Sequence, residues 1–424
     1  MQRLQAFKFE LMPTGEQVHK MCQFAGACRF VFNRALALQV ERYKGGEKKL
    51  GYAGLCKQLT EWRNSTDTPW LADLHSQVGQ QALKDLERAY TNFFDGRASF
   101  PRFRRKGERD SFRFPQRVEV DCANGRVRLP KLGWLRYRNS RAVPGEVRSA
   151  TVSLHAGKWY VSILTTREVE ASVPHGPAVG IDVGITRFAT LSDSTFIAPL
   201  NSFRKHEQRL AKYQRRMGRK VKGSANWKKA KARIQRIHAR IANVRSDFLH
   251  KALATISKNH AMIAVEDLKV RNMSKSASGT LEAPGRNVRA KSGLNKAILD
   301  QGWGEFRRQL EYKTAWCGGF FVLVHPRNTS RTCPCCSHVS AENRTSQAKF
   351  LCAACGYENH ADVVGAINIL SRGSAALRDE GQDTGDASPG CACTARIACG
   401  EPVQSGRSVK QEPAEVTMHT VSHA

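Results

Sequence analysis

Hydrophobic and polar positions change period along the first part of the chain. Residues 7–11 alternate apolar and polar side chains, as a short strand does, and a Pro-Thr-Gly turn ends this pattern. Apolar side chains then recur at helical spacing within residues 18–35 and again within residues 78–93. Residues 13–98 are therefore predicted to form a small helical bundle, with the apolar stripes in its core.

Strand patterns return in residues 99–172. Residues 118–129 predict a hairpin around Asn124-Gly125, and residues 151–164 predict a second hairpin around a glycine. Together with a first strand in residues 1–12, they predict a small β-barrel. The helical bundle would be an insertion between the first strand of this barrel and the others.

Residues 173–370 alternate apolar strands with helices. The strands are predicted at 179–184, 188–191, 261–267 and 320–324, and the helices at 203–247 (a pair) and 294–316. After Leu370 the periodicity stops, and Gly, Ser, Asp, Thr and Pro dominate to the last residue. We therefore expect residues 371–424 to be a disordered tail.

The net charge limits the kinds of partner that this chain, predicted to be a multidomain α+β protein, can have. Its 424 residues allow two to four domains, and 41% of them are hydrophobic, which is enough to bury cores. The net charge of +31 indicates a polyanionic partner, with nucleic acid as the main candidate and a membrane surface as the alternative. We expect no membrane association and a cytoplasmic location, because no apolar run is long enough to span a bilayer and no signal peptide pattern is present.

Two basic regions are candidates for nucleic-acid contacts. Residues 100–106 interleave aromatic and cationic side chains, which can stack on bases and neutralise phosphates, and Phe112-Arg113-Phe114 repeats the pattern. The alternative is a strand with core aromatics and solvated arginines. Residues 203–247 contain only two acids, although such a run is often a solvated face. The candidate contact residues are Phe100, Arg102, Phe103, Arg104, Arg105, Lys106, Arg215, Arg216, Lys228 and Lys229.

Paired cysteines predict a structural metal site. Cys333 and Cys336 form one C-x2-C motif, and Cys352 and Cys355 form another. This double spacing is typical of a tetrahedral Zn²⁺ site without an open position; the alternative is four unrelated buried cysteines. Cys335 is left over. Other cysteines are expected to be reduced core thiols: Cys22, Cys28, Cys56, Cys122 and Cys317.

Three acids lie where a strand ends or a helix begins. Asp182 and Glu266 lie in apolar strand segments, and Asp362 lies at the start of a helical pattern. If they converge at one sheet edge, three carboxylates suit Mg²⁺ or Mn²⁺, and two such ions can drive phosphodiester hydrolysis. The alternative is three separate structural carboxylates. Asp193, Asp267 and Asp300 are nearby acids that we do not place in this site.

An ordered set of motifs resembles the TnpB family. The set consists of GIDVG, AVEDL, the double C-x2-C and NHADVVGAINIL, and the resemblance covers most of residues 1–370. TnpB proteins are transposon-encoded RNA-guided DNA endonucleases related to compact type V CRISPR effectors. One departure is visible: where family members often have Asp-Val-Asn-Ala-Ala, this chain has Asp362-Val363-Val364-Gly365-Ala366.

The resemblance implies a fold and a set of domains. A RuvC nuclease core of RNase H-like fold would occupy residues 173–370, with a zinc ribbon inserted at about 328–357. A wedge β-barrel (residues 1–12 and 99–172) would carry the helical recognition lobe (residues 13–98). Asp182, Glu266 and Asp362 would be the catalytic acids that bind Mg²⁺ or Mn²⁺, and the four paired cysteines would hold zinc.

Three functions remain after these observations. The leading one is a Mg²⁺-dependent DNA endonuclease that is guided by RNA and cuts double-stranded target DNA next to a short flanking motif. The second is a nucleic-acid-binding regulator of transposition whose nuclease is silent, against which the intact acids argue. The third is a transposase, because the same fold and acids serve strand transfer. The sequence does not define an oligomeric state.

Overall fold

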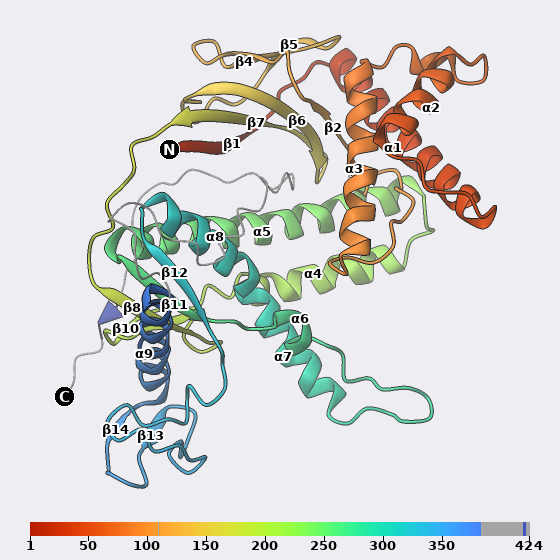
Figure 1. Cartoon of the computed structure of the whole chain (residues 1–424). Coiled ribbons are helices and arrows are strands. Elements are labelled where there is room, and N and C mark those ends of the chain that lie inside the picture. The colour runs from red at the N-terminus through yellow and green to blue at the C-terminus, as the bar shows by residue number, and fades with distance from the viewer. Residues whose placement is uncertain (109, 383–418, 421–424) are drawn as a thin grey trace. The chain divides into compact units, whose positions relative to one another are not determined.

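The computed structural model describes residues 1–108, 110–382 and 419–420 (Figure 1). These residues fall into two compact units, with the division after Val169. Each unit has its own hydrophobic core.

Unit 1 combines helices with two antiparallel sheets around one core. The helices are α1 (Gly15–Lys44), α2 (Tyr52–Asn64), the 3-10 helix η1 (Pro69–Leu71) and α3 (Ser76–Phe94). One sheet has the order β1-β7-β6-β2, from β1 (Gln2–Glu10), β2 (Ser111–Phe114), β6 (Glu146–His155) and β7 (Lys158–Glu168). The other has the order β3-β4-β5, from β3 (Glu119–Asp121), β4 (Arg126–Leu129) and β5 (Gly133–Arg136).

The order of elements in unit 1 follows the sequence pattern. β1 pairs with β7 over its whole length, although the helices α1 to α3 separate these strands in the chain. Thr14 starts α1 with a capping box, since its hydroxyl accepts a hydrogen bond from the Gln17 amide and the Gln17 side chain accepts one from the Thr14 amide. The closure of the two sheets into a barrel stays a prediction.

Unit 2 is built on one mixed sheet with the order β12-β11-β8-β9-β10-β15. β8, β11 and β12 are parallel, whereas β9, β10 and β15 are antiparallel to their neighbours. The strands are β8 (Ala178–Val183), β9 (Ala189–Leu191), β10 (Thr195–Ile197), β11 (Met262–Glu266), β12 (Phe320–Val324) and β15 (His419–Thr420), with a separate hairpin of β13 (Lys349–Leu351) and β14 (Glu358–His360). The helices are α4 (Ser202–Gly218), α5 (Ala225–Asn259), α6 (Val270–Met273), α7 (Val288–Gln301), α8 (Trp303–Trp316) and α9 (Ala361–Gln382).

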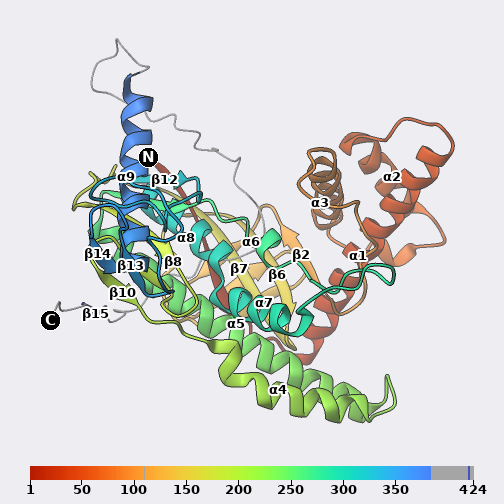
Figure 2. The same cartoon turned by 90° about the horizontal axis from the view of Figure 1, so that it is seen from below.

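Helices cover both faces of this sheet. On one face, Ile181 and Ile263 pack in a core with α5 and α8. On the other face, α9 crosses β8, β11 and β12 (Figures 1 and 2). Gly180 permits this crossing, because a Cβ at that position would lie 2.1 Å from the Ala366 carbonyl oxygen. Side chains alternate along a strand, so Asp182, two residues after Gly180, shares the face that α9 covers.

Two expectations about helix limits are wrong. The helix predicted over residues 294–316 is two helices, because Gly302 adopts a left-handed conformation (φ +76°) between α7 and α8. The helical pattern also does not stop at Leu370, since α9 continues to Gln382. Gly373 lets this extra part lie on β11, where an added Cβ would be 2.6 Å from the Ala264 Cβ. Residues 383–418 and 421–424 of the expected tail lie outside the described residues.

Asp300 caps a helix to which it does not belong. Its side chain is 3% exposed, and its carboxylate accepts hydrogen bonds from the Ser202 hydroxyl (3.1 Å) and from the amides of Phe203 (2.9 Å) and Arg204 (3.3 Å). These are donors of the first turn of α4, where a negative charge also favours the helix dipole. Asp300 is therefore a structural acid, which agrees with its exclusion from the predicted site.

We expect Asp300→Ala to lower the free energy of unfolding by about 2 kcal/mol, because one buried and two partly buried donors lose their acceptor. Thermal unfolding of the full chain measures this. The matched control is Asp247→Ala, which removes a half-exposed acid of α5 whose partner is Lys251 (3.0 Å). Such a surface ion pair contributes about 0.3–0.5 kcal/mol. Equal melting temperatures for the two variants would contradict the capping role.

Candidate active site and cysteine cluster

The sheet of unit 2 brings the three predicted acids together. Val265 lies opposite Ile181 on adjacent parallel strands, so the next residues, Glu266 and Asp182, lie side by side at the carboxyl ends of β11 and β8. Neighbouring strands are about 4.8 Å apart. Asp362 is the second residue of α9, which packs on this face. The three carboxylates therefore share one edge of the sheet. The negative charges of Glu266 and Asp362 are close enough to raise the pKa of Asp182.

Asp182 and Glu266 are difficult to ionise in the absence of metal. Burial raises the pKa of Asp182 to about 8, and the negative charges of Glu266 and Asp362 add to this effect, whereas Arg344 opposes it. Burial also raises the pKa of Glu266, against a hydrogen bond from Thr329. Neighbouring, partly buried acids such as Asp182 and Glu266, whose pKa values are raised, are typical of a divalent-cation site, because a bound cation compensates the clustered charge.

The departure from the family motif separates into two positions with different surroundings. Val364 is fully buried and packs with Cys333, Phe350 and Cys352. Gly365 faces the acids, and an added Cβ there would lie 3.1 Å from Asp182 Oδ2. Valine at position 364 therefore adds apolar contact to the cysteine module, and glycine at position 365 leaves room for the Asp182 carboxylate.

Two cationic or polar neighbours of Asp362 were missed at the sequence level. The Arg344 guanidinium lies 3.8 Å from Asp362 Oδ1, and His360 Nδ1 accepts a hydrogen bond from the Asp362 amide (3.2 Å). Arg344 comes from the segment between the two C-x2-C motifs. The sequence offers no signal for this arginine, because its position depends on how the cysteine module folds against α9.

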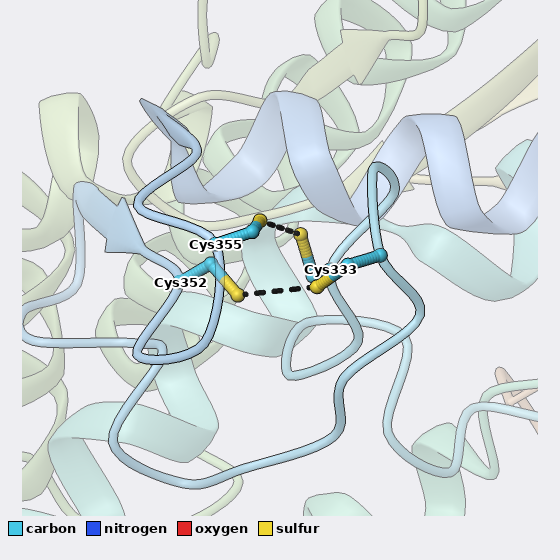
Figure 3. A group of neighbouring side chains, drawn as sticks. Cys333, Cys352 and Cys355 are labelled. Atoms are coloured by element: carbon cyan, nitrogen blue, oxygen red, sulfur yellow. Dashed lines mark hydrogen bonds between the residues drawn. The ribbon is translucent and has the colours of Figure 1, made fainter.

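The four predicted cysteines form a cluster (Figure 3). Their sulfur atoms all lie within 4.8 Å of one another, with 3.6 Å between the sulfurs of Cys333 and Cys355 and 3.5 Å between those of Cys336 and Cys352. Zn–S bonds of about 2.3 Å place tetrahedral sulfurs roughly 3.8 Å apart. The cluster therefore fits Zn²⁺, and its four thiolates would leave no open coordination position.

Local backbone geometry explains why these cysteines meet. Each C-x2-C turn closes with a residue of positive φ, Ser337 (61°) in the first and Gly356 (71°) in the second. The buried amide of Asn343 ties the turns together, because it donates to the His338 carbonyl (3.0 Å) and accepts from the Ala353 amide (3.0 Å). The hydrogen bonds of Asn343 thus hold the two turns of the module together independently of the cysteine side chains.

The remaining described cysteines are free thiols, as expected in a reduced protein. Cys28 is buried, and burial raises the pKa of its thiol to about 12. Cys22 and Cys335 are exposed, so the expectation of a core position is wrong for Cys22.

The predicted nucleic-acid contacts differ in exposure. In unit 1, residues 100–106 form no strand, and Phe100 and Phe103 are 45% and 57% exposed. The alternative of core aromatics is therefore wrong for these two side chains but correct for Phe112 and Phe114, which are buried in β2. Arg104 already has partners within the protein, since its guanidinium lies 3.9 Å from the Phe32 ring centre and 2.9 Å from the Asp85 carboxylate. The exposed cations of this segment are Arg102, Arg105 and Lys106.

In unit 2, the candidate cations lie on the antiparallel pair α4 and α5 (Figure 2). Arg215 and Arg216 lie in the last turn of α4, and Lys228 and Lys229 lie in the first turns of α5. All four are exposed. Their placement is compatible with phosphate contacts, which stay a prediction.

The raised pKa of Asp182 predicts that Mg²⁺ stabilises the protein more at alkaline pH. A carboxyl group with a folded-state pKa of about 8 and an ordinary value of 3.8 keeps its proton in the folded protein, so stability falls as pH rises between these values. Mg²⁺ favours the ionised form and offsets this loss. We expect the rise in melting temperature caused by Mg²⁺ to be larger at pH 8.5 than at pH 6. A rise of equal size at both values would be evidence against Asp182 as a ligand.

Family models match three parts of the chain. A model described as a probable transposase, OrfB of IS605, matches residues 161–277, and a model of the Cas12f1-like TNB domain matches residues 303–369. A third model, described as a helix-turn-helix domain, matches residues 1–48, where the structure contains β1 and α1.

Relatives extend over the full chain. The protein named "Putative RNA-guided DNA endonuclease InsQ" of Escherichia coli (strain K12) is 55% identical and covers 99% of this chain and 100% of its own length. A "Putative RNA-guided DNA endonuclease" of Streptomyces pristinaespiralis is 34% identical, with 97% of each chain covered. Among solved structures, a Cas12f1-sgRNA-target DNA complex has a chain of similar fold, with a TM-score of 0.51, 13% identity and 84% and 83% of the two chains covered. No described helix is long and apolar enough to cross a membrane.

Proposed function

This chain belongs to the TnpB family, the OrfB proteins of IS605, and we propose that it is an RNA-guided DNA endonuclease. Two relatives that match almost the whole chain are named as RNA-guided DNA endonucleases, and this supports the proposal. The structural observation that carries it is the meeting of Asp182, Glu266 and Asp362 at one edge of the unit 2 sheet.

These three acids would hold Mg²⁺ or Mn²⁺. Carboxylate oxygens suit such hard cations, and no soft ligand is needed beside them. When bound, the cations would polarise the scissile phosphate and lower the pKa of an attacking water. Arg344 would contribute positive charge beside Asp362, where a phosphate must approach. The bound cations would favour the ionised forms of Asp182 and Glu266, which lie at the carboxyl ends of β8 and β11.

The finer parts of the fold are proposed on the same basis. We assign the unit 2 sheet to a RuvC nuclease of RNase H-like fold, supported by its mixed strand order and by acids at the ends of two adjacent parallel strands. The cysteine module would be a zinc ribbon with a structural role, supported by the spacing of the four sulfurs. The two sheets of unit 1 would form the wedge barrel, and α1 to α3 the recognition lobe.

Guide RNA and double-stranded target DNA are the proposed partners. The guide would supply sequence specificity by base pairing, and the protein would recognise a short flanking motif and the shape of the heteroduplex. Exposed aromatics and cations in residues 100–106 and exposed cations of α4 and α5 support contacts with stacked bases and phosphates. Both surfaces carry the charge that a polyanion requires.

Purifying the intact chain and sequencing the RNA that it retains tests this function. A discrete RNA species is expected, and replacing its guide segment should redirect Mg²⁺-dependent cleavage to DNA that matches the new guide. The alternatives give different results. A transposase would join DNA strands without a guide, and a regulator would bind nucleic acid but leave matched DNA intact. Cleavage that ignores the guide would contradict the proposal.

A further inference from the structure

The loop between β12 and the first cysteine motif passes beside a catalytic acid. Val324, the last residue of β12, is the register partner of Glu266 on the adjacent strand, so the loop begins beside this acid. Thr329, which is 4% exposed, lies in this loop. Its hydroxyl oxygen is 2.5 Å from Glu266 Oε1 and 3.1 Å from the Pro326 carbonyl oxygen. A hydroxyl has one proton, and Oε1 of Glu266 is both the nearer acceptor and, when the acid is ionised, the stronger one.

Helix α9 fixes the loop on both sides of Thr329. The buried Asn368 amide donates to the carbonyl oxygens of Thr329 (2.7 Å) and Thr332 (2.8 Å). One turn later, Arg372 donates to the carbonyl oxygens of His325 (3.2 Å) and Arg327 (2.5 Å). The same helix carries Asp362 in its first turn. The Thr329 hydroxyl is therefore held in place relative to two of the three acids.

We propose that Thr329 is a positioning residue for the nuclease. Its hydroxyl holds Oε1 of Glu266 and thereby orients the carboxylate, which leaves the second oxygen to a divalent cation. This inference rests on the proposed function of the three acids. Hydrogen bonds to metal-ligating carboxylates fix ligand orientation, and their loss typically weakens metal affinity or activity by about 10–100-fold.

The loop also connects the two metal sites that we propose. Four residues after Thr329, the chain reaches Cys333, whose side chain is buried in the cysteine module. Arg372 holds the start of the loop, and Asn368 holds it as far as Thr332, the residue directly before Cys333, so disorder in the module would begin next to the segment that positions Thr329. One short, hydrogen-bonded segment thus links the folded cysteine module to the side chain of Glu266.

Three variants of the full chain with its guide RNA test Thr329. Thr329→Val keeps the shape but removes the hydroxyl, and Thr329→Ser restores it. The matched control is Thr332→Val, because the Thr332 hydroxyl donates to the Asn328 carbonyl (2.8 Å) in the same loop without touching Glu266. The readouts are the Mg²⁺ concentration for half-maximal cleavage and the binding of Mn²⁺ to DNA-free protein, measured by electron paramagnetic resonance.

We expect Thr329→Val to raise the half-saturating Mg²⁺ concentration by about 10–100-fold and to weaken Mn²⁺ binding, whereas Thr329→Ser and Thr332→Val resemble the wild type. Unchanged metal dependence in Thr329→Val, or an equal shift in Thr332→Val, would overturn the proposal. If Thr329→Val does not fold, Thr329→Ala, which only removes atoms, is judged by the same criteria. If the wild type does not cut guided DNA, the proposed function fails, but Mn²⁺ binding still decides the role of Thr329.

Discussion

Cys352→Ala is expected to remove zinc from the protein and to unfold the module of residues 328–357. Cys352 is 2% exposed, and its sulfur lies 3.5 Å from that of Cys336. A structural Zn²⁺ contributes on the order of 10 kcal/mol of local folding free energy, and three thiolates cannot complete its tetrahedral shell. Zinc content, measured by atomic absorption on the full chain, should fall from one per protein toward zero.

The damage should extend to the nuclease site. Cys333, Cys352 and Phe350 pack against Ala361 and Val364 in the first turns of α9, next to Asp362. Loss of this support should strongly reduce cleavage even though no acid has changed. The matched control is Cys335→Ala, since Cys335 is exposed and lies outside the four-sulfur cluster. This variant should keep its zinc and its activity. Wild-type protein without stoichiometric zinc would disprove the structural zinc site.

Local patterns predicted the parts of the site that depend on nearby residues. The C-x2-C spacing brings each pair of cysteines together within one turn, so the sequence was sufficient to predict the cluster. Asp182 and Glu266 were recognisable because a carboxylate within an apolar strand is costly without a partner. Their convergence with Asp362 required a sheet in which β8 and β11 are neighbours, and the strand order provides this.

Residues whose role depends on tertiary packing could not be predicted. Thr329 is one of several polar residues in its loop, and only the register of β12 beside Glu266 and the contacts of Asn368 distinguish it. Arg344 reaches Asp362 through the fold of the cysteine module. The extension of α9 past Leu370 was not predicted, because a glycine such as Gly373, which permits close packing on β11, adds nothing to apolar periodicity.

Removing any one of the three acids is expected to abolish cleavage while binding persists. Asp182→Ala, Glu266→Ala and Asp362→Ala should each reduce the rate on the order of a thousandfold or more, because two carboxylates cannot hold both cations in line with the phosphate. RNA and DNA affinity should survive, since it comes from base pairing and from cations outside this edge of the sheet. Cleavage of matched DNA with Mg²⁺ and a gel shift at the same salt concentration measure the two properties.

The matched control for the acids is Asp193→Ala. Asp193 is exposed, and its carboxylate accepts hydrogen bonds from the amide (2.9 Å) and hydroxyl (2.7 Å) of Thr195 in the turn between β9 and β10. Removal of this carboxylate should destabilise the turn by about 1 kcal/mol and leave cleavage intact. Substantial cutting by any of the three acid variants would refute a shared metal site. Loss of binding together with cutting would instead show that Asp182, Glu266 or Asp362 supports the fold, because a catalytic ligand can be removed without releasing the nucleic acid.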